Sequence, residues 1–364
     1  MSWPLVKLGE VVTIKGGGTP SKKIEGYWNG NIPWASVKDL KSNKISKTVD
    51  TITELGVNNS ATNIIPAGTI LTATRMALGK FTINTVDMAI NQDLKALFIN
   101  DEAKVDRDFL IRFLESKSQF IDSEGKGATV KGITLDFLKS LEIPLPPLNE
   151  QKRIAAILDK ADAIRRKRQQ AIQLADDFLR SVFLDMFGDP VTNPKGWEVK
   201  SWKDVLSIVN GKNQKAVLSK NGAYPIMGSG GEMGRASDYL TPQNSVIIGR
   251  KGNINKPILV KENFWNVDTA FGLVPEPSML SFNYLYWFCK FFDFERLNKA
   301  VTIPSLTKVD LLQISIPLPD ISKQISFDKI VNKIELIISK NIHSSQSTND
   351  IFNSLSQKAF AGEL

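Results

Sequence analysis

Histidine and cysteine are almost absent from this chain. Its 364 residues include one histidine, His343, and one cysteine, Cys289. A zinc site needs about four thiolate or imidazole ligands, and a Ser-His-Asp or Cys-His site needs a histidine base, so the sequence supports neither. One cysteine cannot form a disulfide within the chain, and this usage fits a reducing cytoplasm. Cys289 lies in the apolar run YLYWFCKFF, and we expect it to be a core thiol.

Long apolar runs are also missing. No run reaches the roughly 18 apolar residues that a membrane helix needs, so we predict no membrane span. The N-terminal sequence MSWPLVKLGE lacks the basic start and apolar core of a secretory signal. We therefore expect a cytoplasmic protein.

The motifs of nucleotide sites, nucleases and nucleic-acid methyltransferases are not found. The glycine-rich runs at 228–234 and 125–132 lack both the dinucleotide spacing and the Lys-Ser/Thr pair of a P-loop. Glu102 and Lys104 resemble the end of a nuclease metal motif, but no suitable acidic pair precedes them. The run at 193–196 does not supply the Asn/Asp-Pro-Pro-aromatic motif of a methyltransferase. We therefore predict a chain with no catalytic residues and no metal site.

Basic residues outnumber acidic ones. The sequence has 46 Lys and Arg against 38 Asp and Glu, which gives a net charge of +8. An excess of this size favours a polyanionic partner, nucleic acid first. A basic protein without such a partner remains the alternative.

One stretch, 146–188, organises the chain. It has no proline or glycine between Pro147 and Gly188, and helix-forming residues fill it. This predicts a helix of about 40 residues, roughly 60 Å long. We interpret the basic run 165–168 as a solvated helix face or a contact for an acidic partner. Apolar residues spaced four and three apart predict a seam against a second helix, and they are Ile157, Ala161, Ile164, Ala171, Ala175, Phe178 and Val182.

The second half of the chain repeats the first. The run IPLPDISKQ at 316–324 lines up with IPLPPLNEQ at 143–151, at a constant offset of 173 residues. WEVKSWKDVL likewise matches WPLVKLGEVV, and Arg75 and Arg250 each end an apolar strand. The second long helix differs from the first in that the middle of its seam is polar. Its polar residues are Asn341, Ser344 and Thr348.

The repeat predicts a mixed α/β fold with a duplicated unit. We expect two α+β modules separated by two long antiparallel coiled-coil helices. The predicted segments are a first module at 1–145, a first long helix at 146–188, a second module at 189–318 and a second long helix at 319–364. The loops differ while the framework repeats, which suits modules that recognise different targets.

The loops of both modules carry groups that bind DNA. Lys and Arg reach phosphates, Arg pairs with guanine, and Asn or Gln pairs with adenine. The first-module candidates are Lys15, Lys22, Lys23, Asn29, Arg75, Lys80, Asn91, Gln92, Lys126, Thr129 and Lys131. The second-module candidates are Lys212, Asn213, Gln214, Lys215, Ser229, Arg235, Arg250, Lys251, Asn253 and Lys256. We expect base contacts first from Arg75, Arg250, Asn91, Gln92, Asn213 and Gln214.

The same stretches give the chain a family likeness. It resembles the specificity subunit of type I restriction-modification systems over essentially its whole length. The matching stretches are IPLPPLNEQKRIAAILDKADAI, SVFLDMFGDP, WPLVKLGEVVTIKGGGTPSKK, YWNGNIPWASVKDL and QKAFAGEL. The second long helix departs from the pattern, since it starts with DISKQ where the first has PLNEQ.

The resemblance implies a role for each part. Each module would be a target recognition domain that reads one half of an asymmetric, bipartite site in double-stranded DNA. The helices would act as a spacer and dock two methyltransferase (modification) subunits, which bind S-adenosylmethionine and methylate adenine. Separate restriction subunits would use ATP and magnesium for translocation and cleavage, so this chain itself would hold no cofactor.

The sequence is also compatible with two other functions. The chain could be a nuclease or methyltransferase with an unrecognised active site, which binding of S-adenosylmethionine or magnesium-dependent cleavage by the purified chain would reveal. It could also be a coiled-coil scaffold that binds only protein. The basic charge and the loop composition argue against the scaffold.

Overall fold

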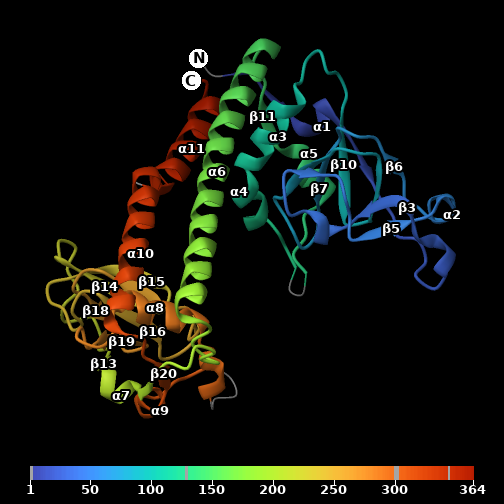
Figure 1. The fold of residues 1–364 in the computed structure, drawn as a ribbon. Coiled ribbons are helices and arrows are strands. Elements are labelled where there is room, and N and C mark those ends of the chain that lie inside the picture. Colours follow the sequence, from blue (N-terminus) through green and yellow to red (C-terminus); the bar gives the residue numbers. More distant parts are fainter. Residues whose placement is uncertain (1–2, 128–129, 299–302, 343–344) are drawn as a thin grey trace. The chain divides into compact units, whose positions relative to one another are not determined.

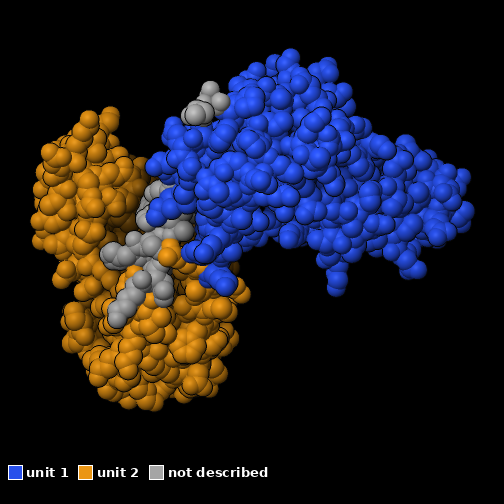
Figure 2. Space-filling model, turned by 90° about the horizontal axis from the view of Figure 1, so that it is seen from above, with its two compact units in different colours: residues 1–167, 344–364 blue, residues 168–343 orange. Residues whose placement is uncertain are grey.

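The chain folds into two compact units, each described here by itself. The structure is a computed structural model that describes residues 3–127, 130–298, 303–342 and 345–364 (Figure 1), with side chains 340–350 left out. One unit comprises Met1–Lys167 and Ser344–Leu364, and the other comprises Arg168–His343 (Figure 2). Within the described ranges, no helix is both long enough and apolar enough to cross a bilayer.

The first unit contains the first module and parts of both long helices. Its strands are β1 (Leu5–Lys7), β2 (Val12–Gly16), β3 (Trp28–Ala35), β4 (Lys44–Ile45), β5 (Asp50–Ile52), β6 (Ile64–Ile65), β7 (Ile70–Ala73), β8 (Phe81–Asn84), β9 (Met88–Ile90), β10 (Leu94–Ile99) and β11 (Glu142–Pro144). Its helices are α1 (Leu8–Val11), η1 (Glu25–Tyr27), η2 (Val37–Asp39), α2 (Glu54–Asn58), α3 (Arg107–Ser116), α4 (Ser118–Ser123), α5 (Leu135–Ser140) and α11 (Ser345–Ala361), with the start of α6 (Leu148–Phe187).

The second unit contains the rest of α6 and the second module. Its strands are β12 (Val199–Ser201), β13 (Leu206–Asn210), β14 (Tyr224–Gly228), β15 (Gly231–Ala236), β16 (Ser245–Gly249), β17 (Ile258–Val260), β18 (Trp265–Asn266), β19 (Ala270–Pro275) and β20 (Ser315–Pro317). Its helices are α7 (Trp202–Val205), α8 (Phe282–Phe291), η3 (Phe294–Leu297), α9 (Lys308–Leu312) and α10 (Ile321–Ile342).

The main sheets of the two modules share the order of four strands, and the first module adds a fifth, β4. The main sheet has the order β2-β10-β7-β8-β4 in the first module and β13-β19-β16-β17 in the second. In each, the first three strands pair antiparallel. Each module also has one parallel pair beside this sheet, β3 with β9 and β14 with β18. The predicted mixed α/β fold with a duplicated module is therefore confirmed.

The repeated glutamine holds the base of each long helix. Gln151 and Gln324 are fully buried. The Oε1 atom of Gln151 accepts the backbone N–H of Asp106, which caps α3, at 2.8 Å. The Oε1 atom of Gln324 accepts the backbone N–H of Ser281, which caps α8, at 2.9 Å. Each Nε2 donates to two further backbone carbonyls, so the sequence repeat is reproduced bond for bond.

Helix α6 buries a different stripe from the one predicted. Ile154 and Leu158 are buried in the core of the first unit, and Leu179 and Phe183 in that of the second. Phe178, which the sequence placed in the seam, is 50% exposed. The predicted seam was therefore wrong in register. Both stripes have the four-and-three spacing, and the larger side chains on this one pack into the modules.

The second long segment forms α10 and α11. Phe327 and Val331 of α10 are buried, and they follow Ile154 and Leu158 by 173 residues. In the first unit, Arg153 of α6 donates to the carbonyl of Leu364 at 3.1 Å, and Arg165 lies over the ring of Phe352 at 5.3 Å. Residue numbers thus rise in opposite directions, and the two helices are antiparallel there. Asn341, Ser344 and Thr348 lie outside the residues whose side chains are described.

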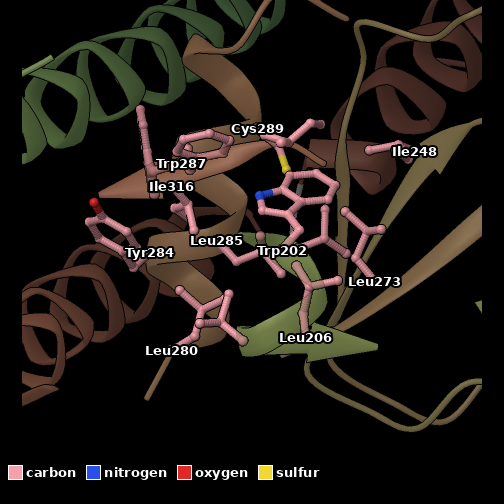
Figure 3. Close-up of a cluster of buried hydrophobic side chains, with 14 of the residues drawn as sticks. Trp202, Leu206, Ile248, Leu273, Leu280, Tyr284, Leu285, Trp287, Cys289 and Ile316 are labelled. Carbon is pink, nitrogen blue, oxygen red and sulfur yellow. The ribbon is translucent and has the colours of Figure 1, made fainter. Parts of the chain in front are cut away.

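Aromatic side chains fill the core of the second unit (Figure 3). The ring centroid of Phe183 lies within 5.0 Å of Phe187 and 5.4 Å of Tyr284. Trp202 and Cys289 lie in the same cluster, and burial raises the pKa of the Cys289 thiol. The prediction of a core thiol is confirmed.

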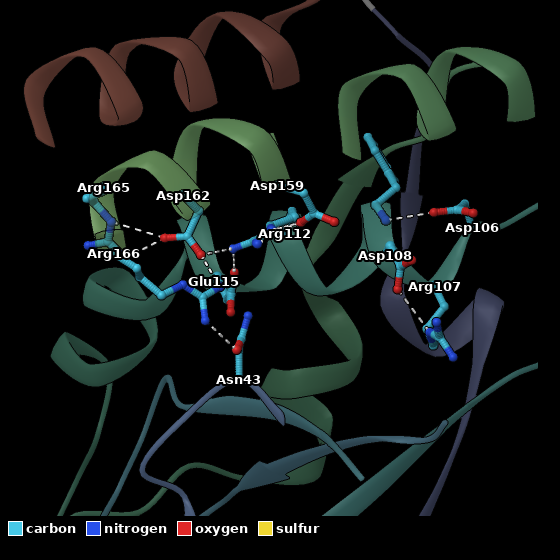
Figure 4. A network of polar contacts seen from close by, with 11 residues as sticks. Asn43, Asp106, Arg107, Asp108, Arg112, Glu115, Asp159, Asp162, Arg165 and Arg166 are labelled. Carbon is cyan, nitrogen blue, oxygen red and sulfur yellow. Dashed lines mark hydrogen bonds and ion pairs between the residues drawn. The ribbon is translucent and has the colours of Figure 1, made fainter. Parts of the chain in front are cut away.

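A charged network joins the first module to α6 (Figure 4). The buried Arg112 guanidinium of α3 donates to Asp162 at 3.2 Å. Burial alone would raise the pKa of Asp162, but hydrogen bonds from Arg165 and Arg166 and the charge of Arg112 lower it. Arg166 also donates to Asn43 at 2.9 Å. Arg165 and Arg166 are therefore engaged within the chain, while Arg166 and Lys167 are exposed, as predicted for a solvated face.

Candidate nucleic-acid interface

One end of each main sheet, where three strands begin or end, gathers most of the predicted contacts of the second module and some of those of the first. In the first module, β2 ends, β10 begins and β7 ends at this end, where Gly16 pairs with Lys95 and Lys95 pairs with Thr72. In the second module, β13, β19 and β16 meet in the same way, and Gly249 pairs with Ala270. We call these the first edge and the second edge.

A glycine allows two loops to approach closely at each edge. A Cβ atom added to Gly17 would lie 1.9 Å from the carbonyl oxygen of Ile90. A Cβ atom added to Gly211 would lie 1.8 Å from the carbonyl oxygen of Val267. No side chain fits at either distance, so both edges require glycine directly after the first strand.

In each module a tryptophan donates a hydrogen bond to the backbone carbonyl of the residue that follows this glycine. The indole N–H of Trp34 donates to the carbonyl of Gly18 at 3.0 Å. That of Trp265 donates to the carbonyl of Lys212 at 3.0 Å. Trp34 lies on β3 and Trp265 on β18, so different strands hold the same loop. The two edges are thus rigid in backbone although their side chains differ.

Arg75 leads a basic loop at the first edge. It is exposed and follows β7, and it forms a β-bridge with Gly132. Lys126 bridges to the same glycine, and Lys131 is 57% exposed beside Asp122 at 3.9 Å. The structure therefore brings Arg75, Lys126 and Lys131 together. Thr129 lies outside the described residues.

Arg250 lies at the end of the equivalent strand of the second edge, one residue earlier than the position of Arg75. The bridge that Arg75 makes to Gly132 is made there by Lys251 to Ser305. Arg250 is exposed, follows β16 and lies over the ring of Phe271 at 5.9 Å. Asn253 and Lys256 lie exposed further along this loop. Both edges thus carry an arginine just after the equivalent strand, at positions that differ by one residue.

Lys95 is an edge residue that the sequence reasoning missed. It lies on β10, and its Nζ atom donates to the carbonyl of Leu94 at 3.2 Å. Burial lowers the pKa of its ammonium group, and the charge of Arg75 lowers it further while Asp93 opposes this. Only the pairing of β10 with both β2 and β7 places it here. An alternating strand residue gives no such indication in the sequence.

The side chain of Asn91 is committed to the fold. It is 6% exposed, and its Oδ1 atom accepts the backbone N–H groups of Asp93 and Leu94, each at 3.1 Å. This argues against the predicted base contact, so we remove Asn91 from the candidate set. Its neighbour Gln92 is exposed, and its Oε1 atom accepts the hydroxyl of Thr19.

The loop after β13 presents a run of polar residues at the second edge. Lys212, Asn213 and Lys215 are exposed, and Gln214 is half-buried. Ser229 also reaches this edge, since its Cβ atom lies 3.1 Å from where a Cβ of Gly249 would be.

The side chain of Arg235 is paired with two acidic residues. It lies on β15, 3.1 Å from Glu232 and 3.8 Å from Glu262. These two ion pairs compete with a phosphate or base for its guanidinium group, so we rank it below the other predicted contacts of the second module.

Four of the remaining candidates of the first module lie apart from the Arg75 loop. The fifth, Lys80, lies at the end of that loop. Lys22, Lys23 and Asn29 are exposed around η1 and the start of β3. Lys15 lies on β2 with its Nζ atom 5.1 Å from the ring centroid of Phe98. Lys80 is exposed immediately before β8.

The described residues contain no ligand set for a metal ion. Across residues 3–127, 130–298, 303–342 and 345–364, no group of three His, Cys, Asp or Glu side chains could hold a metal ion. What the edges offer is exposed cations, amides and a fixed backbone, which is the chemistry of phosphate and base contacts.

Comparison with known proteins finds one family in both halves of the chain. The family model of the type I restriction modification DNA specificity domain matches residues 2–174 and 194–346. The chain is 29% identical over 245 residues to the specificity subunit of the MjaIX enzyme of Methanocaldococcus jannaschii, covering 62% of this chain and 57% of that protein. It is 37% identical over 164 residues to the EcoR124I/EcoR124II specificity subunit of Escherichia coli, covering 43% of this chain and 40% of that protein.

Two matches extend over most of the chain. The EcoprrI specificity subunit of Escherichia coli is 22% identical over 355 residues, covering 91% of this chain and 87% of that protein. A crystal structure of a type I restriction-modification S subunit from M. genitalium has a TM-score of 0.68 at 18% identity, covering 98% of this chain and 96% of that one. At this identity the structural match establishes the fold.

Proposed function

Because the chain belongs to the family of the type I restriction modification DNA specificity domain, we propose that it is a DNA-reading subunit whose two modules each recognise one half of a bipartite site. The observation that carries this is the pair of equivalent sheet edges. Each has an arginine at a strand end, a glycine loop and a set of lysines and amides that differs from the other set. Equivalent backbones with different side chains suit two different half-sites, so the full site is asymmetric.

The partners follow from the same proposal. The chain supplies recognition, and two methyltransferase subunits supply S-adenosylmethionine and adenine methylation. Restriction subunits supply ATP- and magnesium-dependent translocation and cleavage. The described residues offer no metal cluster for such chemistry, and the relatives are named as specificity subunits. We therefore propose a non-catalytic role in the cytoplasm.

Helix α6 is proposed to set the distance between the half-sites. At about 1.5 Å per residue, its 40 residues span roughly 60 Å. Inserting one heptad into α6 and one into the segment 319–364 adds about 10 Å and preserves the helix faces. The recognised spacer should lengthen by about three base pairs at 3.4 Å each, with both half-sequences unchanged. Methylation sequencing reads this out, and a heptad replaced by alanines at the same place controls for the sequence change. An unchanged spacer would exclude the ruler role.

DNA affinity should depend steeply on salt. Each phosphate contact releases counterions, so six to ten contacts weaken binding about 10³-fold or more between about 50 and 200 mM salt. Fluorescence anisotropy with a labelled duplex measures the slope of log affinity against log salt. Lys126→Ala removes one exposed cation of the first edge and should reduce this slope by about 1. A DNA affinity that does not change with salt in the wild-type protein would rule out a polyanionic partner.

The decisive experiment is modified-base sequencing of genomic DNA. Cells expressing this chain with its methyltransferase are compared with cells that lack the chain. Methylated adenines at one asymmetric bipartite site, lost without the chain, are the expected result. Methylation at the same site in both would mean that the methyltransferase carries its own specificity. Binding of S-adenosylmethionine or cleavage of DNA by the purified chain alone would instead support an enzyme.

A further inference from the structure

The turn at the tip of the Arg75 loop has an unusual backbone. Met76 has a φ of +68°, in the left-handed region. Among the described residues, the other non-glycine residues with positive φ are Asn29, Asn193 and Asn244. Asparagine tolerates this region, but a longer side chain such as methionine rarely adopts it. Something other than turn propensity therefore accounts for methionine at this position.

The surrounding backbone holds Met76 in place from both sides. The N–H of Ala77 donates to the carbonyl of Arg75 at 2.8 Å, which closes a three-residue γ-turn around Met76. The N–H of Met76 donates to the carbonyl of Lys131 at 3.0 Å, and Arg75 bridges Gly132. A strained turn that its neighbours enforce is typical of a functional position.

The side chain of Met76 is left unburied by this arrangement. It is 68% exposed, although a methionine is usually a core residue. The exposed cations Arg75, Lys126 and Lys131 share its loops, and Val130 beside Lys131 is 49% exposed. The first edge thus presents an apolar group among three cations, of which Lys131 is paired with Asp122.

This combination selects one feature of duplex DNA. Cations face the phosphates, and an arginine can pair with guanine in the major groove. The apolar group that a base pair presents in that groove is the 5-methyl group of thymine. On the strength of the proposed function, we propose that Met76 is a specificity-determining residue that packs against the 5-methyl group of a thymine in the first half-site, next to the base that Arg75 reads.

The turn at the second edge has no apolar residue in the position of Met76. Arg250 is followed by Lys251 and Gly252, and the left-handed position there, with φ +78°, belongs to the glycine. A turn of this kind can therefore be built without an apolar side chain. A contact from this turn is therefore assigned to the first half-site. The exposed apolar residue of the second edge is Ile303, which lies on the facing loop and is 60% exposed.

The test compares thymine with uracil, which lacks the methyl group. The chain in complex with its methyltransferase binds duplexes that carry its methylated site, and each thymine of the half-site lost in Arg75→Ala is replaced by uracil in turn. The wild-type complex should bind about fourfold more weakly at one position, the factor for one buried methyl-sized group. Met76→Leu should keep this discrimination. Met76→Asn, which suits the left-handed backbone, should bind the thymine and uracil duplexes equally.

The control is an equally exposed apolar residue outside the edge loops. Leu55 on α2 is 60% exposed, and Leu55→Asn should keep the thymine preference. Unchanged discrimination in Met76→Asn would overturn the proposal, as would a half-site in which no thymine responds to uracil. In both cases a wild-type complex that still binds its site upholds the proposed function. A wild-type complex that binds no site contradicts the proposed function and the methyl contact together.

Discussion

Arg250→Ala should abolish or relax recognition of one half-site and leave the other unchanged. Arg250 is exposed at the end of β16, on an edge whose backbone Gly211 and Trp265 fix. Loss of a bidentate contact to guanine costs about 1–3 kcal/mol, which is a factor of roughly five to 150 in affinity. Methylation sequencing of cells with the variant reads both halves in one experiment. Arg75→Ala should give the mirror result at the other half.

Arg235→Ala is the matched control for Arg250→Ala. Both arginines belong to the second module, but Arg235 is paired with Glu232 and Glu262. Its removal should leave the methylated sequence unchanged. Equal losses at both half-sites in Arg250→Ala would contradict modular recognition, and an effect of Arg235→Ala as large as that of Arg250→Ala would show that the sheet edge does not define the contact.

Phe183→Ala should destabilise the second unit by about 3–5 kcal/mol. Phe183 is fully buried on α6, and its ring lies 5.4 Å from Tyr284 and 5.5 Å from Phe327. Truncation leaves a cavity between α6, α8 and α10 that these rigid rings cannot fill. Chemical denaturation followed by circular dichroism and tryptophan fluorescence measures the free energy of unfolding.

Phe178→Ala provides the comparison on the same helix. Phe178 is 50% exposed, so its truncation removes little buried area and should cost about 1 kcal/mol or less. The sequence alone assigns Phe178 to the helix seam. Equal costs for the two variants, or a larger cost for Phe178, would restore that seam and contradict the observed register.

Local patterns determined the long helix, the duplication and the family. The absence of proline and glycine between 147 and 188 dictates one helix, and α6 is observed at Leu148–Phe187. The offset of 173 residues identified the repeat, and the buried glutamines Gln151 and Gln324 show why it extends to single atoms. These features depend on neighbours in the chain, so one sequence suffices to predict them.

Packing decided which stripe of α6 is buried and which polar residues are accessible. Spacing of four and three residues fits the stripe through Phe178 as well as the one through Phe183, and only the aromatic core of the second unit selects Phe183. Composition likewise cannot separate Asn91, whose oxygen holds a turn, from Lys95, which strand pairing brings to the first edge. Both outcomes depend on contacts between residues far apart in the chain. The sequence therefore determined what the two edges are made of, and the tertiary structure decided which of these groups face a partner.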